Sequence, residues 1–272
     1  MVKNFIIFFD FIGRLWRSRY MLRTMAARDL KAMYVGSVFG LLWAVLNPLF
    51  LVAIYGIVFG VFMKSTPGAV YKTDSFFLFL LCGLVPWQFF TQALTTSSGV
   101  LVANSNLVKK AVGFPSEILP IVVVISNIIS HLISVALLLI ILIIFNHSLP
   151  ITTPYIFIYL FFAAIFCIGC GWVLSSLNVF SKDVNQILGI AIMGLFFLTP
   201  VLYSSDIVPP GALFIMKLNP IYHLVEGYRF ALLAGRFLPL PDFIYLAVTS
   251  FGMFGLGGVL FRKMKPWFAE VM

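Results

Sequence analysis

Residues 119–145 read LPIVVVISNIISHLISVALLLIILIIF, and residues 154–180 read PYIFIYLFFAAIFCIGCGWVLSSLNVF. Neither stretch contains Asp, Glu, Lys or Arg. Each is longer than the roughly twenty apolar residues that a helix needs to cross the hydrocarbon core of a bilayer. An uncharged turn at 146–153 joins them. The two stretches therefore predict two successive membrane-spanning helices.

Four further apolar runs lie on either side of this pair, at 37–63, 76–98, 186–203 and 243–261. The chain of 272 residues is 62% hydrophobic and only 10% charged, whereas a soluble domain needs far more polar surface to cover its core. We therefore predict an all-α integral membrane protein with about six transmembrane helices.

The first 31 residues hold seven Lys or Arg side chains. At helical spacing one face of this segment is apolar, and it carries Phe8, Phe11, Ile12, Leu15 and Trp16. A helix of this kind lies in the membrane interface, with its arginines among anionic head groups. We predict a cytoplasmic interfacial helix over residues 1–32, in which Arg14, Arg17 and Arg19 contact lipid head groups.

The basic residues are distributed unevenly around the predicted spans. If the chain starts inside, thirteen of its 18 Lys and Arg residues fall on inner segments and five on outer ones. Because basic loops favour the cytoplasmic side, we predict that both termini are cytoplasmic. The six-span domain then covers 33–262, and a short cytoplasmic tail covers 263–272. The net charge of +9 is explained by basic residues at the ends of the predicted spans, so it does not indicate nucleic-acid binding.

Motifs for energy coupling and catalysis are missing from the sequence. There is no Gly-x-x-x-x-Gly-Lys-[Ser/Thr] loop to cradle ATP phosphates. No carboxylate lies inside a predicted span, although ion-coupled carriers generally need an ionisable group there. We interpret His131 as a helix-to-helix hydrogen bond, and Cys167 and Cys170 as packing residues rather than metal ligands. Any energy for uphill transport would therefore enter from another polypeptide.

Small residues in the fourth and last spans predict close helix packing. They are Gly169, Gly171, Gly252, Gly255, Gly257 and Gly258.

A polar segment at 103–118 separates the second and third spans. Asn104 or Ser105 can cap a short helix there, and Gly113 and Pro115 end it. On the residues alone, this segment is either a knob for a soluble partner or an ordinary basic loop.

Three sets of residues stand in order along nearly the whole chain. The first comprises Arg28-Asp29-Leu30-Lys31, Tyr34, Ser37, Gly40, Trp43 and Asn47-Pro48-Leu49. The second comprises Asn106-Leu107-Val108-Lys109-Lys110 and Phe114-Pro115-Ser116-Glu117-Ile118-Leu119-Pro120. The third comprises Asn219-Pro220 and Glu226-Gly227-Tyr228-Arg229. Together they resemble the membrane subunits of ATP-binding-cassette polysaccharide exporters, the ABC-2 permease class, and are closest to O-antigen export permeases.

The resemblance implies a homodimer in a bacterial inner membrane, with two cytoplasmic ATPase subunits that bind ATP and Mg while this chain carries no cofactor. The substrate would be a polyprenyl-diphosphate-linked polysaccharide, exported for lipopolysaccharide biosynthesis. The segment 103–118 would couple the permease to the ATPase through Asn104, Asn106, Leu107, Lys109, Lys110, Phe114, Pro115 and Glu117.

The resemblance also implies that 204–236 forms short helices re-entering the membrane from outside as an outer gate. Its residues would be Pro209, Pro210, Asn219, Pro220, Glu226 and Arg229. Glu226 and Arg229 are three residues apart and can face each other on one helix. Aromatic side chains can stack on sugar rings, and the candidates for the substrate path are Trp43, Tyr55, Trp87, Phe89, Phe90 and Tyr203.

Two alternatives remain open at this point. The first is a permease of the same class for capsule, teichoic acid, another lipid or a drug. The second is a membrane-embedded enzyme acting on lipid-linked sugars, for which Asp183, Asp206 and His223 are the candidates.

The base asymmetry predicts the topology directly. Reporter fusions after Thr73 and Ser148 should read outside, and fusions after Lys110, Lys182 and Lys265 should read inside. An outside reading at Lys110 would contradict both the topology and the coupling role of 103–118.

Overall fold

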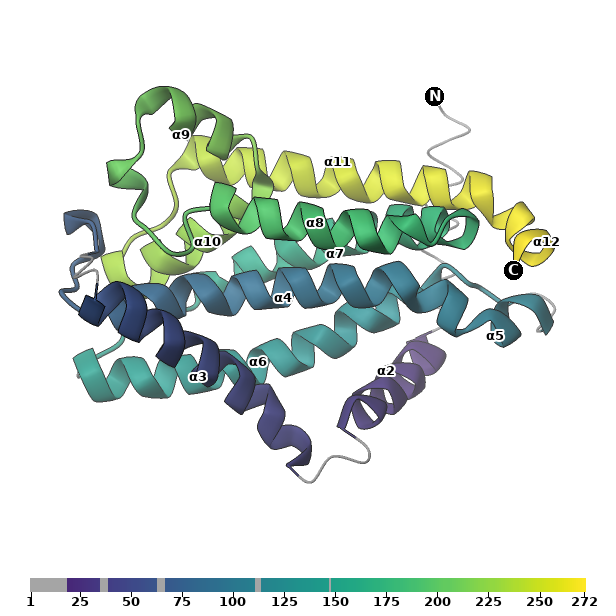
Figure 1. Cartoon of the computed structure of the whole chain (residues 1–272), viewed down its shortest axis with the longest axis horizontal. Helices are drawn as coiled ribbons and strands as arrows, with labels where there is room; N and C mark the ends of the chain where they lie inside the picture. The colour runs from purple at the N-terminus through teal and green to yellow at the C-terminus, as the bar shows by residue number, and fades with distance from the viewer. Residues whose placement is uncertain (1–18, 35–38, 63–66, 111–113, 147) are drawn as a thin grey trace.

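The computed structural model describes residues 19–34, 39–62, 67–110, 114–146 and 148–272, and these ranges contain helices and no strand (Figure 1). The long helices are α2 (Arg19–Tyr34), α3 (Trp43–Tyr55), α4 (Phe76–Ala103), α6 (Ile118–Asn146), α7 (Tyr155–Phe180), α8 (Asp183–Leu198) and α11 (Leu240–Met264). The short helices are α5 (Ser105–Lys110), α9 (Pro210–Lys217), α10 (Pro220–Arg229) and α12 (Phe268–Val271). The remaining helical segments are η1 (Gly40–Leu42), η2 (Gly56–Phe62), η3 (Ala69–Tyr71), η4 (Ser205–Ile207), η5 (Phe230–Ala234) and η6 (Lys265–Trp267).

Four helices in the described ranges are long and apolar enough to cross a membrane, namely α4, α6, α7 and α11. The other two predicted spans correspond to α3, which continues into the π-helical η2, and to α8. The 16 residues of α8 extend for about 24 Å, less than the ~30 Å hydrocarbon core. The all-α membrane class is therefore confirmed, and the number of six spans stays a prediction.

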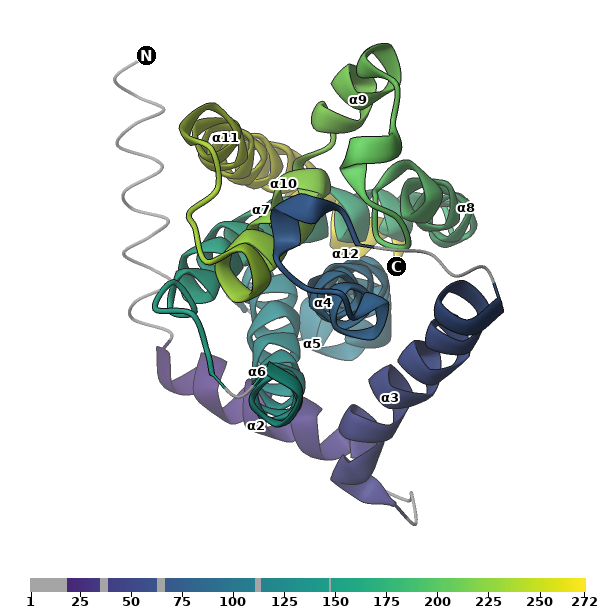
Figure 2. The same ribbon diagram turned by 90° about the vertical axis from the view of Figure 1, so that its left-hand side faces the viewer.

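The helices α4, α6, α7, α8 and α11 run side by side and alternate in direction, whereas α3 is tilted and α2 lies across them (Figures 1 and 2). The helices α5 and α12 lie at one end of the bundle, and η3 and α9 lie at the other (Figure 1). Viewed from that second end, α4 is in the middle (Figure 2) and contacts α3, α6, α7, α8 and α10. This alternation is the one expected from the predicted order of spans.

The buried apolar side chains form two clusters. The larger one surrounds α4 and includes Ile221, Leu224, Val225 and Tyr228 of α10. The smaller one lies at the α5 end, and we call it the inner cluster after the predicted topology. It comprises Met25, Ala26, Val100, Leu101, Ile118, Leu119, Ile121, Val122, Val123, Trp172, Phe261 and Phe268. The two ends of the bundle are therefore stabilised by separate groups of side chains.

Helix α2 belongs to the inner cluster. Its Met25 and Ala26 are buried against α6, and the Ser126 hydroxyl donates a hydrogen bond to the Ala26 carbonyl at 3.3 Å. Of the predicted interfacial segment 1–32, the structure describes residues 19–32. The proposed lipid contacts of Arg14 and Arg17, and the side chain of Arg19, lie outside the described residues.

Two glycines bring α7 and α11 into backbone contact. A Cβ atom at Gly169 would lie 2.5 Å from the carbonyl oxygen of Met253, and one at Gly257 would overlap the backbone of Gly169. Gly258 packs against the Trp172 ring, and Gly171 packs against Ser97. The predicted close packing is therefore confirmed at these four glycines. A Cβ at Gly252 or Gly255 would meet no atom within 4 Å.

The substitution Gly257→Ala should destabilise the protein, because the new methyl group would push α11 away from α7. We expect the free energy of unfolding to fall by about 1–3 kcal/mol, the usual cost of overpacking. Gly255→Ala, on the same helix but facing open space, should leave stability unchanged or slightly higher. Thermal unfolding of the detergent-solubilised variants measures the difference, and equal midpoints would contradict the packing argument.

Candidate functional site

The chain between α8 and α11 breaks into short helices at its prolines. Pro210 begins α9, and Pro220 occupies the first turn of α10, where proline's missing N–H costs nothing. The Asn219 carboxamide oxygen accepts from the Ile221 N–H at 3.1 Å, and its Nδ2 donates to Thr199 Oγ1 at 2.8 Å. The predicted pair of short helices joined at Asn219-Pro220 is confirmed, and Asn219 attaches the joint to the end of α8.

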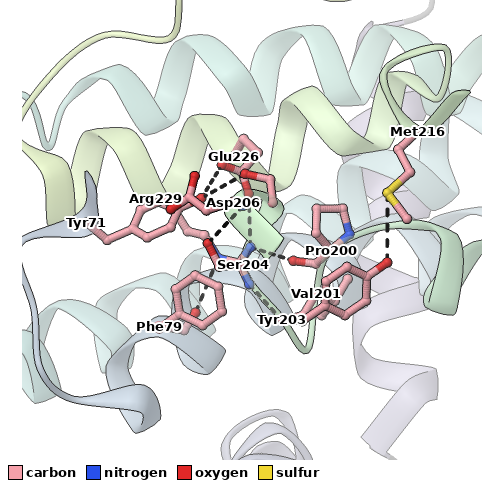
Figure 3. Close-up of polar contacts among 11 residues, drawn as sticks. Tyr71, Phe79, Pro200, Val201, Tyr203, Ser204, Asp206, Met216, Glu226 and Arg229 are labelled. Carbon is pink, nitrogen blue, oxygen red and sulfur yellow. Dashed lines mark hydrogen bonds and ion pairs between the residues drawn. The ribbon is translucent and has the colours of Figure 1, made fainter. Parts of the chain in front are cut away.

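Helix α10 carries a fully buried ion pair. Arg229 Nη1 lies 3.0 Å from Glu226 Oε1, and the two side chains are 0% and 2% exposed. The same guanidinium donates to the carbonyl oxygens of Pro200 at 2.5 Å and Val201 at 2.7 Å (Figure 3). The predicted pairing of Glu226 with Arg229 is confirmed, and the pair also binds the chain that follows α8.

The Arg229 guanidinium packs directly against helix α4. The Arg229 Cζ lies 3.6 Å from the centre of the Phe79 ring, and Nε donates to the Phe79 carbonyl at 3.4 Å. One turn further along, a Cβ on Gly83 would lie only 2.6 Å from Nη2. Aromatic face and glycine together let a cation approach the helix closely, and the stacking stabilises the desolvated charge.

Tyr71 completes the cluster from the loop between η2 and α4. Its hydroxyl donates to Glu226 Oε2 at 2.6 Å and lies 3.4 Å from Ser205 Oγ (Figure 3). Burial, and next the charge of Glu226, raise the pKa of the Tyr71 phenol well above its usual range. The phenol therefore stays protonated and keeps donating to Glu226, so each oxygen of that carboxylate has a partner.

A buried charge is tolerated only when its hydrogen bonds are satisfied. Here one arginine joins α10 to α4 and to residues 200–201, while Glu226 joins α10 to η3 through Tyr71. The orientation of α10 therefore depends on this cluster (Tyr71, Phe79, Pro200, Val201, Glu226 and Arg229), which we call the outer ion-pair cluster after the predicted topology.

A second, more exposed set of contacts ties α9 to the start of α11 and to α10. Lys217 Nζ lies 3.2 Å from Asp242 Oδ2, and His223 Nε2 donates to the Lys217 carbonyl at 2.8 Å. The Tyr245 hydroxyl donates to the Leu218 carbonyl at 2.6 Å. These residues form the α11 tether.

The segment 103–118, for which a coupling role is predicted, contains the short helix α5, as expected. Asn106 and Lys109 are exposed, whereas Leu107, Val108 and Phe114 pack against the inner cluster. The Asn104 side chain donates to the Val100 carbonyl at 2.9 Å, so it caps the end of α4 rather than the start of α5.

The other predicted coupling residues lie beside α5. Pro115 is half-buried and Glu117 is buried, and the Lys110 side chain lies outside the described part of the structure. Glu117 makes an ion pair with Lys265 at 2.5 Å, a partner that the sequence did not suggest. The segment therefore has an exposed face and an anchored face.

The aromatic residues predicted for the substrate path separate into two groups. Trp87, Phe89 and Phe90 are buried within the protomer, whereas Trp43 is exposed and Tyr55 and Tyr203 are half-buried. Phe90 also lines an apolar cavity of about 540 Å³ between α4, α7, α8, the joint of α9 and α10, and Met253 of α11. A lining of this kind offers few hydrogen-bond partners to sugar hydroxyls. The path role of all six residues stays a prediction.

Sequence reasoning missed several residues of the two sites. Tyr71, Phe79, Gly83 and Lys265 stand in ordinary loop or helix positions, and only their neighbours in space give them roles. His131 was interpreted as a helix-to-helix hydrogen bond, and its Nε2 indeed lies 2.8 Å from the Tyr228 hydroxyl of α10. Within the described ranges, no group of three His, Cys, Asp or Glu side chains is placed to hold a metal ion.

Several known transport proteins are similar to this chain over most of its length. Residues 20–233 match the family described as ABC-2 type transporter. An O-antigen export system permease protein RfbA from Klebsiella pneumoniae is 30% identical over 246 residues, which is 90% of this chain and 92% of the relative. A protein of the same name from Myxococcus xanthus is 28% identical, with 95% and 98% covered. The polysialic acid transport protein KpsM from Escherichia coli is 24% identical, with 83% and 86% covered.

The substitution Arg229→Met should be strongly destabilising, because it leaves Glu226 buried beside an apolar group. We expect a loss of about 3–5 kcal/mol in the free energy of unfolding, the range for removing one partner of a buried ion pair. Lys217→Met removes a cation that is 39% exposed, and there we expect about 0–1 kcal/mol. Unfolding in detergent measures both, and similar losses would contradict the assignment of α10 to the outer ion-pair cluster.

Proposed function

Because this chain belongs to the ABC-2 type transporter family, we propose that it is the membrane permease half of an ATP-driven exporter. Its substrate is a lipid-linked cell-surface polysaccharide of the O-antigen type, which it carries across the bacterial inner membrane. Two copies of the chain form the permease, with both termini in the cytoplasm. Two separate ATPase subunits bind the ATP and Mg, and the polysaccharide is attached to a polyprenyl diphosphate.

The observation that carries the proposal is the similarity to O-antigen export permeases along at least nine-tenths of the chain. It reaches across both the coupling segment and the outer ion-pair cluster, so it is not confined to the apolar runs that all membrane proteins share. A polypeptide without an ATP-binding loop of its own needs a partner that supplies the energy, and α5 offers that partner an exposed face.

The coupling role is proposed for the exposed face of α5. Lys109→Glu reverses an exposed charge without disturbing the packed face, so it should weaken ATPase docking and lower nucleotide-driven export. Lys182→Glu makes the same charge change at the exposed junction of α7 and α8, at the same end of the bundle, and should leave both unchanged. Binding of the purified ATPase to each variant in detergent measures docking. Equal affinities would remove α5 from the interface.

The outer gate role is proposed for α9 and α10. The apolar residues Phe214, Ile215 and Leu218 are exposed on this segment, and the outer ion-pair cluster holds α10 inside the bundle. Non-helical backbone at membrane depth is tolerated only where protein or a cavity surrounds it. A cross-link from a cysteine at Met216 to the second protomer should stop export while ATP still binds. Undiminished export after complete cross-linking would leave α9 without a gating role.

The similarity to a polysialic acid transport protein favours one second candidate, a permease for capsule-type polysaccharide. An enzyme acting on lipid-linked sugars has less support. Asp206 is exposed, His223 is buried, and Asp183 lies at the other end of the bundle beside Ser181. These three side chains do not converge on one site.

The decisive experiment follows the polysaccharide in cells that lack this chain. We expect finished lipid-linked polymer to accumulate inside, where antibody reaches it only after the cells are permeabilised. Restoring the chain should return polymer to the surface, whereas restoring the Lys109→Glu variant should do so only partly. Composition of the polymer separates O-antigen from capsule. Absence of finished polymer in the deleted strain would favour the enzyme instead.

A further inference from the structure

The coupling segment is held at its far end by an ion pair with the segment that follows α11. Lys265 Nζ lies 2.5 Å from Glu117 Oε2, and the Glu117 side chain is only 7% exposed. The Glu117 carbonyl accepts a hydrogen bond from Trp172 Nε1 at 2.9 Å. Glu117 therefore links the start of α6 to both α7 and η6.

The same segment holds α5 through apolar contacts. Phe268 is 1% exposed and lies 5.3 Å from the Phe261 ring and 6.3 Å from the Phe180 ring. It belongs to the inner cluster, against which Leu107 and Val108 of α5 also pack, and α12 contacts α5 directly. A helix of six residues is not stable by itself in water, so its position is decided by these contacts.

The opposite end of α11 holds the outer helices. Asp242, in the first turn of α11, pairs with Lys217 of α9, and Tyr245 donates to the Leu218 carbonyl. Between its two ends, α11 is in backbone contact with α7 at Gly257 and Gly169. One continuous helix thus carries the coupling segment at one end and the re-entrant helices at the other (Figure 1).

We propose that α11 is the mechanical link between the two sites, with Lys265 and Asp242 as its positioning residues. Lys265 transfers movement of the coupling segment to α11, and Asp242 transfers movement of α11 to α9 and α10. The link to ATP rests on the proposed function, whereas the clamp on α5 does not. In this arrangement the residues after α11 act as a clamp rather than as a free cytoplasmic tail.

The clamp is tested on the purified permease alone, by hydrogen–deuterium exchange. Lys265→Gln should speed exchange of the α5 amides by about tenfold, because a charged hydrogen bond to a buried carboxylate is lost. Lys263→Gln, an exposed lysine two residues earlier, is the matched control and should change nothing. Pairing Glu117→Lys with Lys265→Glu should restore part of the protection. Unchanged exchange of α5 in Lys265→Gln would overturn the clamp, whatever the chain transports.

The link is tested on the complex with its ATPase in lipid vesicles. In the otherwise unaltered protein, a cysteine at Met216 should change its reactivity towards a membrane-impermeant thiol reagent when ATP is added. Lys265→Gln and Asp242→Asn should each abolish that change while ATP hydrolysis continues, and Lys263→Gln should retain it. A response that persists in both variants would overturn the link. A parent complex that neither hydrolyses ATP nor exports polymer would contradict the proposed function instead, and the exchange result for α5 would still stand.

Discussion

A guanidinium group can leave water only if its N–H donors find acceptors within the protein, and Arg229 finds them on three separate parts of the chain. Glu226 supplies a carboxylate, Phe79 supplies a carbonyl and a ring face, and residues 200–201 supply two further carbonyls. Removing any of these groups would leave a desolvated charge with a missing partner. Helix α10 is consequently held in one orientation, and the loop carrying Tyr71 is held with it.

The outer ion-pair cluster also determines how α10 packs within the larger apolar cluster. Apolar contacts alone are non-directional, and several rotations of a ten-residue helix would bury similar side chains. The outer ion-pair cluster selects one of them. His131 on α6 and Tyr159 on α7 add directional contacts of the same kind, to the Tyr228 hydroxyl and to the Leu238 N–H. A polar network thus specifies the packing of this otherwise apolar bundle.

At the α5 end of the bundle, the helices are held mainly by apolar packing rather than by a buried ion pair. The inner cluster collects side chains from α2, α4, α6, α7, α11 and α12, and Leu107 and Val108 of the short helix α5 pack against it. Separate clusters at the two ends would allow the ends to move independently, and α11 is a helix that contacts the proposed coupling segment near one end and the proposed gate helices near the other. An exporter of the proposed kind must convert ATP hydrolysis on one side into opening on the other, and a continuous helix is a stiff element for that task.

The sequence by itself determined the class of the protein and the boundaries of two of its long helices. The thickness of the bilayer sets the length of an apolar run, so the predicted spans at 119–145 and 154–180 match α6 and α7 closely. Proline and asparagine act within one or two residues, which is why the break at Asn219-Pro220 was predictable. The pairing of Glu226 with Arg229 follows from helical geometry in the same local way.

Only the tertiary structure decided which side chains surround those local features. Phe79 and Arg229 are 150 residues apart, and Glu117 and Lys265 are 148 apart, so no local pattern relates them. The aromatic residues show the same limit, since Trp87 is buried and Trp43 is exposed although both stand in apolar runs. In a membrane protein, the lipid and the protein interior are equally apolar. The hydrophobicity of a helix therefore does not show which of its faces contacts lipid and which packs against other helices.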